Sequence, residues 1–302
     1  MQTNDLIHIN SPIEKIVSKI VVLYAYYEKN QSYKENLLFF LKYGYISDEN
    51  IDFIIIINGQ FTIVFPQIKN LFVIQRENTG YDFQAWNTGL KSLSKKQKVY
   101  DYYIFLNSSV RGPFIPTYSL KYMRWYQGYI DLLKNDVKLV GSTICLLPPN
   151  SYWNPQNPNL CPCVQTYVFA MDNDCVNFLL STGFWEKSYN TVTLVSIYQE
   201  RLLSILVLAN GWNISCLIPE YQNRNYKNLK NNFNPTTNSI GDIALNGLNT
   251  CFGRTIHPYE VLFMKNNRPN NTNYLSLMSL STFSFINLPI ENDTNIKEIL
   301  NK

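Results

Sequence analysis

Four short apolar runs within the first 106 residues constrain the fold of this chain more than any other feature. Each run is nearly continuous in aliphatic and aromatic residues, which is typical of a parallel strand that is covered on both faces. Segments long enough to form a helix separate the runs. Strands that alternate with helices in this way form an open, mainly parallel sheet with helices on both faces. We therefore expect an α/β fold whose strands include residues 20–26, 51–57, 70–74 and 99–106.

The residues that follow these runs indicate a binding site. In open α/β sheets, ligands bind at the carboxyl ends of the strands. Each of the four expected ends is polar or aromatic in this chain, whereas a purely structural loop needs no such residues. The ends carry Tyr24 and Tyr26, Asn58, residues 76–82 and residues 107–111.

The longest of these ends, residues 76–86, reads Arg-Glu-Asn-Thr-Gly-Tyr-Asp-Phe-Gln-Ala-Trp. It follows a strand and leads into a helical segment, and the backbone N–H groups of such a junction can bind an anion. Gly80 permits a positive φ in the turn, and Asp82 can cap the helix. Trp86 falls on the apolar face of that helix, which favours a core position over a ligand contact. The stretch is neither a GxGxxG motif nor a Walker loop, so an ordinary capped turn is the alternative.

Beyond residue 116 the pattern changes. We expect one domain over residues 1–268, with a nucleotide-binding half up to residue 116, a second half over 117–268, and a tail over 269–302. The segment Pro148–Pro162 should be a loop over the site, with Trp153 as a wall. Periodicity predicts helices over 118–133, 174–180 and 191–209, and strands over 137–147, 164–171, 212–217 and 257–264.

Charge and composition exclude some classes of function. The net charge of +4 comes without a dense Lys/Arg block, which argues against nucleic-acid binding. The first residues lack the pattern of a signal peptide, and the longest apolar runs are too short to span a bilayer. We therefore expect a soluble, cytoplasmic protein without a transmembrane segment. Its six cysteines should be free thiols, and Cys161-Pro162-Cys163 lacks the partners of a zinc site.

Residues 76–86 resemble the REN-x-GYDFGAW signature of a group of GT-A-type glycosyltransferases. That group is related to rhamnan-synthesis F-type proteins and to the rhamnosyltransferase domain of chlorovirus capsid-glycan enzymes. Four further blocks resemble the same group and follow in the expected order between about residues 20 and 268. They are Tyr103–Phe114, Val164–Met171, Glu200 within its helix, and Ile256–Lys265.

The resemblance implies a GT-A-like (Rossmann-like) fold that transfers a sugar from a nucleotide diphosphate sugar to a glycan or another hydroxyl acceptor. The donor would be uridine-linked, with rhamnose as a candidate sugar, and the setting would be viral or bacterial polysaccharide synthesis in the cytoplasm, that of the host for a virus. GT-A enzymes commonly carry Asp-x-Asp after the fourth strand, where it binds a divalent cation. This chain has Asn107-Ser108-Ser109 instead, which puts a Mn²⁺ or Mg²⁺ cofactor in doubt. His257 is the candidate metal ligand.

The resemblance also assigns roles. Glu200 is the candidate catalytic base, with a solvated helix carboxylate as the alternative and Glu186 in reserve. Asp82 would contact the ribose or base of the donor, and Tyr24 and Tyr26 would stack on the base unless they are core residues. Positive charge for the diphosphate would come from Arg76, Arg111 or Lys265. The remaining candidate donor-binding residues are Asn58, Asn78, Gly80, Asn107, Ser108 and Ser109.

Two other functions stay open at this point. The missing Asp-x-Asp fits a catalytically inactive module of the same fold that binds a nucleotide or a glycan. A nucleotidyltransferase would also use polar loops at the strand ends. A carboxylate placed opposite the anomeric carbon of the donor distinguishes them, because a glycosyltransferase needs one and a binding module does not.

Overall fold

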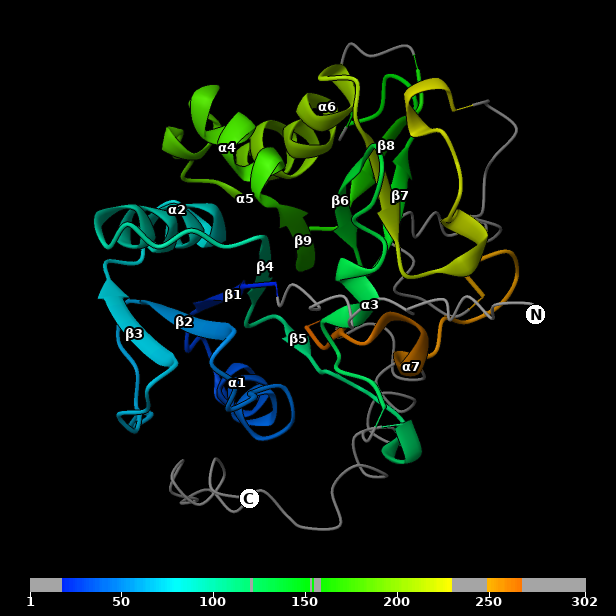
Figure 1. Ribbon diagram of the computed structural model, residues 1–302. Helices are drawn as coiled ribbons and strands as arrows, with labels where there is room; N and C mark the ends of the chain where they lie inside the picture. The colour runs from blue at the N-terminus through cyan, green and yellow to red at the C-terminus, as the bar shows by residue number, and fades with distance from the viewer. Residues whose placement is uncertain (1–17, 120–121, 153, 155–158, 230–248, 268–302) are drawn as a thin grey trace, which may run out of the picture.

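The structure is a computed structural model that describes residues 18–119, 122–152, 154, 159–229 and 249–267. Its centre is a seven-stranded sheet in the order β10-β6-β9-β4-β1-β2-β3 (Figure 1). Every pairing in this sheet is parallel except those of β9, which runs antiparallel to both β4 and β6. The strands are β1 (Ile20–Tyr26), β2 (Ile51–Asn58), β3 (Leu71–Arg76), β4 (Tyr102–Asn107), β6 (Val137–Gly141), β9 (Val168–Asp172) and β10 (Asn213–Cys216).

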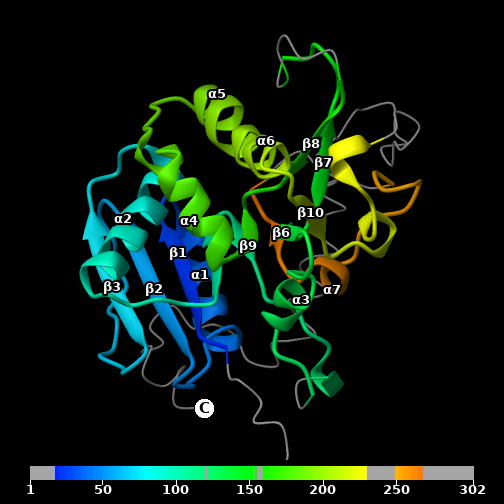
Figure 2. The same cartoon turned by 45° about the horizontal axis from the view of Figure 1, so that its top comes forward.

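Helices cover both faces of this sheet (Figure 2). Val21, Leu23 and Ala25 of β1 point into one core, together with residues of α2, α4 and α6. The alternate side chains of β1 point into a second core, which includes residues of α1 and α3. The helices are α1 (Gln31–Tyr43), α2 (Tyr81–Lys95), α3 (Gln127–Ile130), α4 (Asn173–Ser181), α5 (Val192–Val195), α6 (Arg201–Ala209) and α7 (Pro258–Val261).

The fold class predicted from the sequence, an open and mainly parallel α/β sheet with helices on both faces, is therefore confirmed. Every residue of β1 is buried, as a continuous apolar run predicts for a central strand. At the edge of the sheet β3 instead alternates between buried or half-buried and exposed residues. Two small antiparallel sheets complete the structure: β5 (Val110–Arg111) with β11 (Met264–Lys265), and β7 (Ile144–Leu147) with β8 (Cys161–Val164).

Three predictions for the second half of the chain are wrong. The helix expected over 118–133 is reduced to α3 and a 3₁₀ turn. Between these two elements, the buried Trp125 donates its indole N–H to the carbonyl of Gly44 at 2.7 Å. The strand expected over 137–147 is divided into β6 and β7, which belong to different sheets. The strand expected over 257–264 is mostly α7, because Pro258 follows a helix-capping His257 and Glu260 completes a capping box.

The helix expected over 191–209 exists, but it contains an irregular turn. Residues Ser196–Glu200 form a π turn between α5 and α6. Val192–Ala209 is also, among the described residues, the one helical stretch long and apolar enough to cross a membrane, with a mean hydropathy of 1.5. The sequence-based expectation considered apolar runs only and missed it. This result rests on length and composition only, and 28% of the stretch is buried inside the protein, including Leu203 and Val207.

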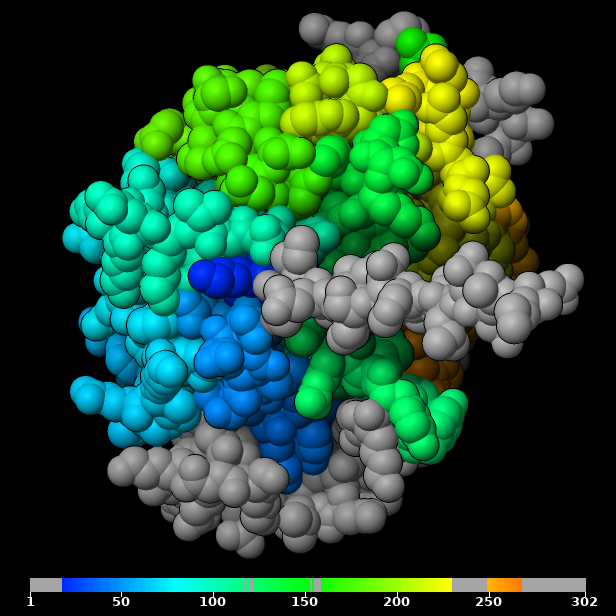
Figure 3. All heavy atoms as spheres, viewed as in Figure 1, coloured from blue at the N-terminus to red at the C-terminus, as the bar shows by residue number. Residues whose placement is uncertain are grey.

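The remaining expectations concern cysteines and loops. All six cysteines are free, as predicted, and all six are buried. Figure 3 shows the segment from α4 to α6, in yellow-green, at the surface at the top of the view. Trp153, expected as a wall of the site, and the tail over 269–302 lie outside the described residues.

Candidate functional site

The candidate site lies at the carboxyl ends of the central strands, and its centre is the carboxylate of Asp82. Asp82 is half-buried in the first turn of α2. The side-chain amide of Asn107, at the end of β4, donates a hydrogen bond of 2.8 Å to Asp82 Oδ2. Removal from water raises the pKa of Asp82 to about 6, an effect that Asn107 and Lys265 oppose and Glu200 increases. Glu200 and Lys265 therefore each lie close enough to Asp82 to interact with it electrostatically.

A local backbone feature places Asp82 here. Gly80 precedes α2 with φ +67°, and a Cβ atom at this position would lie 2.3 Å from Gln84 Cγ. This confirms the predicted positive φ. The prediction that Asp82 can cap the helix is wrong, because Gly80 occupies the cap position without a side-chain hydrogen bond. The carboxylate of Asp82 is instead bound by Asn107, a partner on another element.

Asn107, Ser108 and Ser109 lie in the predicted place, but they support the scaffold. Asn107 Oδ1 accepts hydrogen bonds from the backbone N–H and the hydroxyl of Ser109, at 3.0 and 2.6 Å. Ser108 Oγ accepts a bond from the backbone N–H of Tyr27 at 3.1 Å, which ties β4 to β1. The polar atoms of these side chains are thus largely occupied within the protein.

These residues do not fit a divalent cation held by the protein. Mg²⁺ and Mn²⁺ prefer carboxylate oxygens, and the turn after β4 offers none. Within the described ranges, no group of three or more His, Cys, Asp or Glu residues could hold a metal. His257 is the cap of α7, and its Nδ1 accepts the backbone N–H of Tyr259 at 3.2 Å.

The two arginines predicted to face the phosphates are also bound within the protein. Arg76 donates to Asn58 Oδ1 at 2.6 Å and to the carbonyl of Thr79 at 2.9 Å, so it braces the turn before α2. Arg111 is an ion-pair partner of Glu35 at 3.1 Å, and burial lowers the pKa of its guanidinium.

Lys265 is the cation whose charge acts on Asp82. It lies on β11, and its Nζ atom is 5.6 Å from the centre of the Tyr167 ring. Asn78 lies exposed in the turn that Arg76 braces.

The structure places Tyr24 and Tyr26 in the core, which is the alternative that the sequence left open. Their exposed fractions are 1% and 0%, so neither ring has a face available to a nucleobase. Tyr26 donates its hydroxyl to Glu28 at 2.9 Å. The buried hydroxyl of Tyr24 has no hydrogen-bond partner among the described residues. Tyr27, the next residue along, is 38% exposed.

Glu200 ends the π turn and is half-buried. Burial is the main cause of the raised pKa of Asp82, and the carboxylate of Glu200 adds to it, so the two carboxylates lie within electrostatic range of each other. Glu186, the reserve candidate, lies at the surface with its side chain 60% exposed and forms an ion pair of 2.8 Å with Lys91. Of the two acids, Glu200 is the one that the fold brings to Asp82.

Sequence reasoning missed two residues that organise this region. Asn36 of α1 is fully buried, donates to the carbonyl of Ser108 at 2.9 Å, and accepts a bond from Arg111 at 3.0 Å. Ser196 donates to the carboxylate of Glu200 at 3.0 Å. The spacing of Ser196 and Glu200 along one helix could have indicated their contact, whereas no sequence signal links Asn36 to the end of β4.

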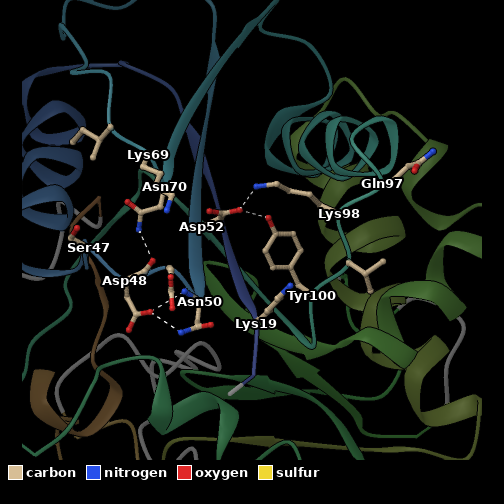
Figure 4. Close-up of a pocket in the computed structure, with 13 residues that line it drawn as sticks. Lys19, Ser47, Asp48, Asn50, Asp52, Lys69, Asn70, Gln97, Lys98 and Tyr100 are labelled. Carbon is tan, nitrogen blue, oxygen red and sulfur yellow. Dashed lines mark hydrogen bonds and ion pairs between the residues drawn. The ribbon is translucent and has the colours of Figure 1, made fainter. Parts of the chain in front are cut away.

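A separate cleft of about 740 Å³ opens at the other end of the sheet, where the strands begin (Figure 4). It is lined by residues that precede or open β1, β2, β3 and β4. Asp52 pairs there with Lys98 at 2.6 Å and also accepts the hydroxyl of Tyr100. The cleft is therefore remote from Asp82 and is not part of the candidate site.

Comparison with known proteins gives a family and a distant structural likeness. Residues 55–240 match the family described as rhamnan synthesis protein F, which is more than half of the chain. No curated protein matches the chain significantly. Among solved structures, a mannosyltransferase from Pyrobaculum calidifontis in complex with GDP-mannose and Mn²⁺ is similar at 10% identity and a TM-score of 0.40. The match covers 67% of this chain and 55% of that chain.

Proposed function

The chain belongs to the rhamnan synthesis protein F family, and from this premise we propose that it is a glycosyltransferase that uses a nucleotide diphosphate sugar. The donor is a uridine diphosphate sugar, with rhamnose as the sugar. The acceptor is a hydroxyl group of a growing glycan. The matched region contains Asp82, Asn107 and Glu200 and so includes most of the candidate site.

One observation carries the proposal: Glu200 and Lys265, from two other elements, each lie within electrostatic range of Asp82, which opens α2 beyond the carboxyl end of β3. Glycosyl transfer needs a base for the acceptor hydroxyl and positive charge for the leaving diphosphate. Glu200 can act as the base, and Lys265 can supply the positive charge. Both lie within electrostatic range of the half-buried Asp82. Burial, with Glu200 adding to it, raises the pKa of Asp82, and perturbed carboxylates of this kind cluster at functional sites.

In this proposal Glu200 removes the proton from the acceptor hydroxyl, whose oxygen attacks the anomeric carbon of the donor. The bond from that carbon to the diphosphate breaks, and Lys265 stabilises the negative charge of the leaving group. Asp82 accepts hydrogen bonds from hydroxyl groups of the donor. Because the base and the leaving group lie on opposite sides of the anomeric carbon, the product has the inverted configuration.

The wider assignments are part of the same proposal. Residues 1–116 form the half that binds the nucleotide sugar, and residues 117–268 form the half that binds the acceptor, within one domain. The reaction takes place in the cytoplasm. Asp82 of α2 is the donor contact of the first half, whereas Glu200 and Lys265 belong to the second half.

A panel of nucleotide sugars, tested by thermal shift with and without Mn²⁺ or Mg²⁺, examines the proposal directly. A ligand that binds the folded protein raises the unfolding temperature, by an amount that grows with its concentration relative to Kd. We expect UDP-rhamnose or another uridine diphosphate sugar to give the largest shift. If calorimetry detects no binding of any nucleoside diphosphate at millimolar concentration, the proposal is wrong.

A second candidate is a module of the same fold that binds a nucleotide or glycan without catalysis. It is favoured by the turn after β4, where Asn107 and Ser109 bind each other and offer no carboxylate. Turnover separates the two functions. Release of free UDP from a bound UDP-sugar, dependent on added acceptor, supports the transferase, and binding without UDP release supports the module.

A further inference from the structure

The helix that carries Glu200 is interrupted at the point where the candidate base lies. The backbone N–H of Arg201 bonds to the carbonyl of Ser196, five residues back, which is the pattern of a π turn. Such a turn inserts one residue into an α-helix and is found frequently at functional sites. Here it lies between α5 and α6, and Glu200 is its last residue.

Two hydrogen bonds hold Glu200 itself. The hydroxyl of Ser196 donates to Glu200 Oε2 at 3.0 Å. The thiol of Cys163, on β8, donates to the backbone carbonyl of Glu200 at 3.5 Å. The other carboxylate oxygen, Oε1, accepts no hydrogen bond from any residue that the structure describes. One oxygen of the carboxylate is therefore held by Ser196, whereas the other keeps its capacity to accept a proton.

The turn is also tied to the helix that carries Asp82. Gln199 is fully buried and donates to the carbonyl of Lys187 at 2.9 Å. The same carbonyl accepts a bond of 2.7 Å from Gln84, two residues after Asp82 on α2. A single backbone oxygen thus links the π turn to α2, and so relates the position of Glu200 to that of Asp82.

We propose that Ser196 is a positioning residue, whose hydroxyl holds the carboxylate of Glu200 so that Oε1 takes the proton of the acceptor. This inference rests on the proposed function, in which Glu200 is the base. A glutamate side chain has three rotatable torsions, and a half-buried one that lacks this bond samples several orientations. Loss of the hydroxyl therefore lowers the fraction of bound complexes in which the base is correctly oriented.

The test is a double-mutant cycle of Ser196→Ala and Glu200→Gln, measured as UDP release from UDP-rhamnose with a rhamnan oligosaccharide as acceptor. Ser196→Ala should lower kcat roughly 10- to 100-fold, the scale of losing exact positioning, while KM for the donor is unchanged. Ser196→Thr retains the hydroxyl and should recover most of kcat. In the Glu200→Gln background, Ser196→Ala should have no further effect, because the carboxylate on which it acts is gone.

Ser181→Ala is the matched control. Among the residues that the structure describes, the hydroxyl of Ser181 bonds only to the carbonyl of Phe178 in its own helix α4, and its loss should leave kcat unchanged. The inference is wrong if Ser196→Ala keeps the kcat of the unmodified protein. It is also wrong if the effects of Ser196→Ala and Glu200→Gln on the activation free energy add in the double variant. A raised donor KM at unchanged kcat would also overturn it. If instead Glu200→Gln alone leaves turnover intact, the base assignment of the proposed function fails, and the inference fails with it.

Discussion

The side-chain amide of Asn107 donates a hydrogen bond of 2.8 Å to the carboxylate of Asp82, and so joins the end of β4 to the first turn of α2. This bond favours the ionised form of Asp82, as does the charge of Lys265. Burial and the neighbouring Glu200 act in the opposite direction and outweigh them. Ionisation of Asp82 is therefore unfavourable in the free protein, and a ligand can use the charge of this carboxylate.

The first prediction concerns this cost. Since the pKa of Asp82 in the folded protein is about 6, and so above the usual value of about 3.9, the folded protein holds this proton more tightly than the unfolded chain. Stability from this residue is therefore complete below about pH 4 and is lost as pH rises through about 6. Asp82→Asn removes the charge and keeps an oxygen to accept from Asn107. We expect it to raise the unfolding temperature at pH 8 and to have little effect at pH 4.

Thermal unfolding of both proteins across this pH range measures the difference. An Asp82→Asn protein that is less stable than the unmodified protein at pH 8 would mean that the ionised carboxylate stabilises the fold. The assignment of a raised pKa to Asp82 in the folded protein would then be wrong.

The central sheet could be predicted from the sequence because the signal for each strand lies within a few consecutive residues. The apolar runs of β1 and β2 are continuous, and burial on both faces requires this of a central strand. The same topology predicts the position of the candidate site, since the carboxyl ends of parallel strands meet at one edge. Asp82 and Glu200 were identified by a resemblance, and the fold brings them within electrostatic range.

The roles of single polar residues depend on partners far away in the chain, which the sequence does not reveal. Arg111 pairs with Glu35 across 76 residues, so its charge is bound within the scaffold. Tyr24 and Tyr26 project from one face of β1 because side chains alternate along a strand, and α1 covers that face. His257 is a case in which a readable signal was missed, because His-Pro-x-Glu has the spacing of a capping box.

Gly80 offers a test of the turn that positions Asp82. Gly80→Ala should destabilise the protein through strain at φ +67° and through contact with Gln84 Cγ at 2.3 Å. Gln84 cannot move freely, because it donates to the carbonyls of Trp185 and Lys187. Gly183→Ala is the matched control, since Gly183 has φ +69° with nothing within 4 Å. We expect the free energy of unfolding to fall by roughly 1–3 kcal/mol more for Gly80→Ala than for Gly183→Ala.

Urea unfolding of the two variants gives this difference directly. Equal losses would show that strain in φ is the whole effect and that the Gln84 contacts do not constrain the turn.

Lys265 should contribute more to donor binding than a divalent cation does. The described residues do not fit a protein-held metal, whereas Lys265 is the cation that acts on Asp82. We expect Lys265→Ala to weaken binding of UDP by roughly 10- to 100-fold, the scale of one hydrogen bond to a charged group, and EDTA to weaken it less. Lys69→Ala is the control, because Lys69 lines the cleft at the opposite end of the sheet (Figure 4).

Isothermal calorimetry with UDP compares the three conditions. Loss of binding in EDTA together with full binding by the Lys265→Ala protein would show that a cation neutralises the diphosphate. Weaker binding by the Lys69→Ala protein would place the nucleotide in the opposite cleft.

The last prediction concerns the base, for which the structure separates the two candidates. Glu200→Gln keeps the size of the side chain and an oxygen for Ser196, but an amide cannot take a proton from the acceptor. Turnover should fall roughly 10²- to 10⁴-fold, the usual cost of losing a general base, while donor affinity is nearly unchanged. Glu186→Gln changes a side chain that is 60% exposed and paired with Lys91 at the surface, so its effect should be small. Rates of UDP release and the anomeric configuration of the product, determined by NMR, decide between them. Retention of configuration, or near-normal turnover of the Glu200→Gln protein, would remove Glu200 from this role, and a large effect of Glu186→Gln would give the role to Glu186.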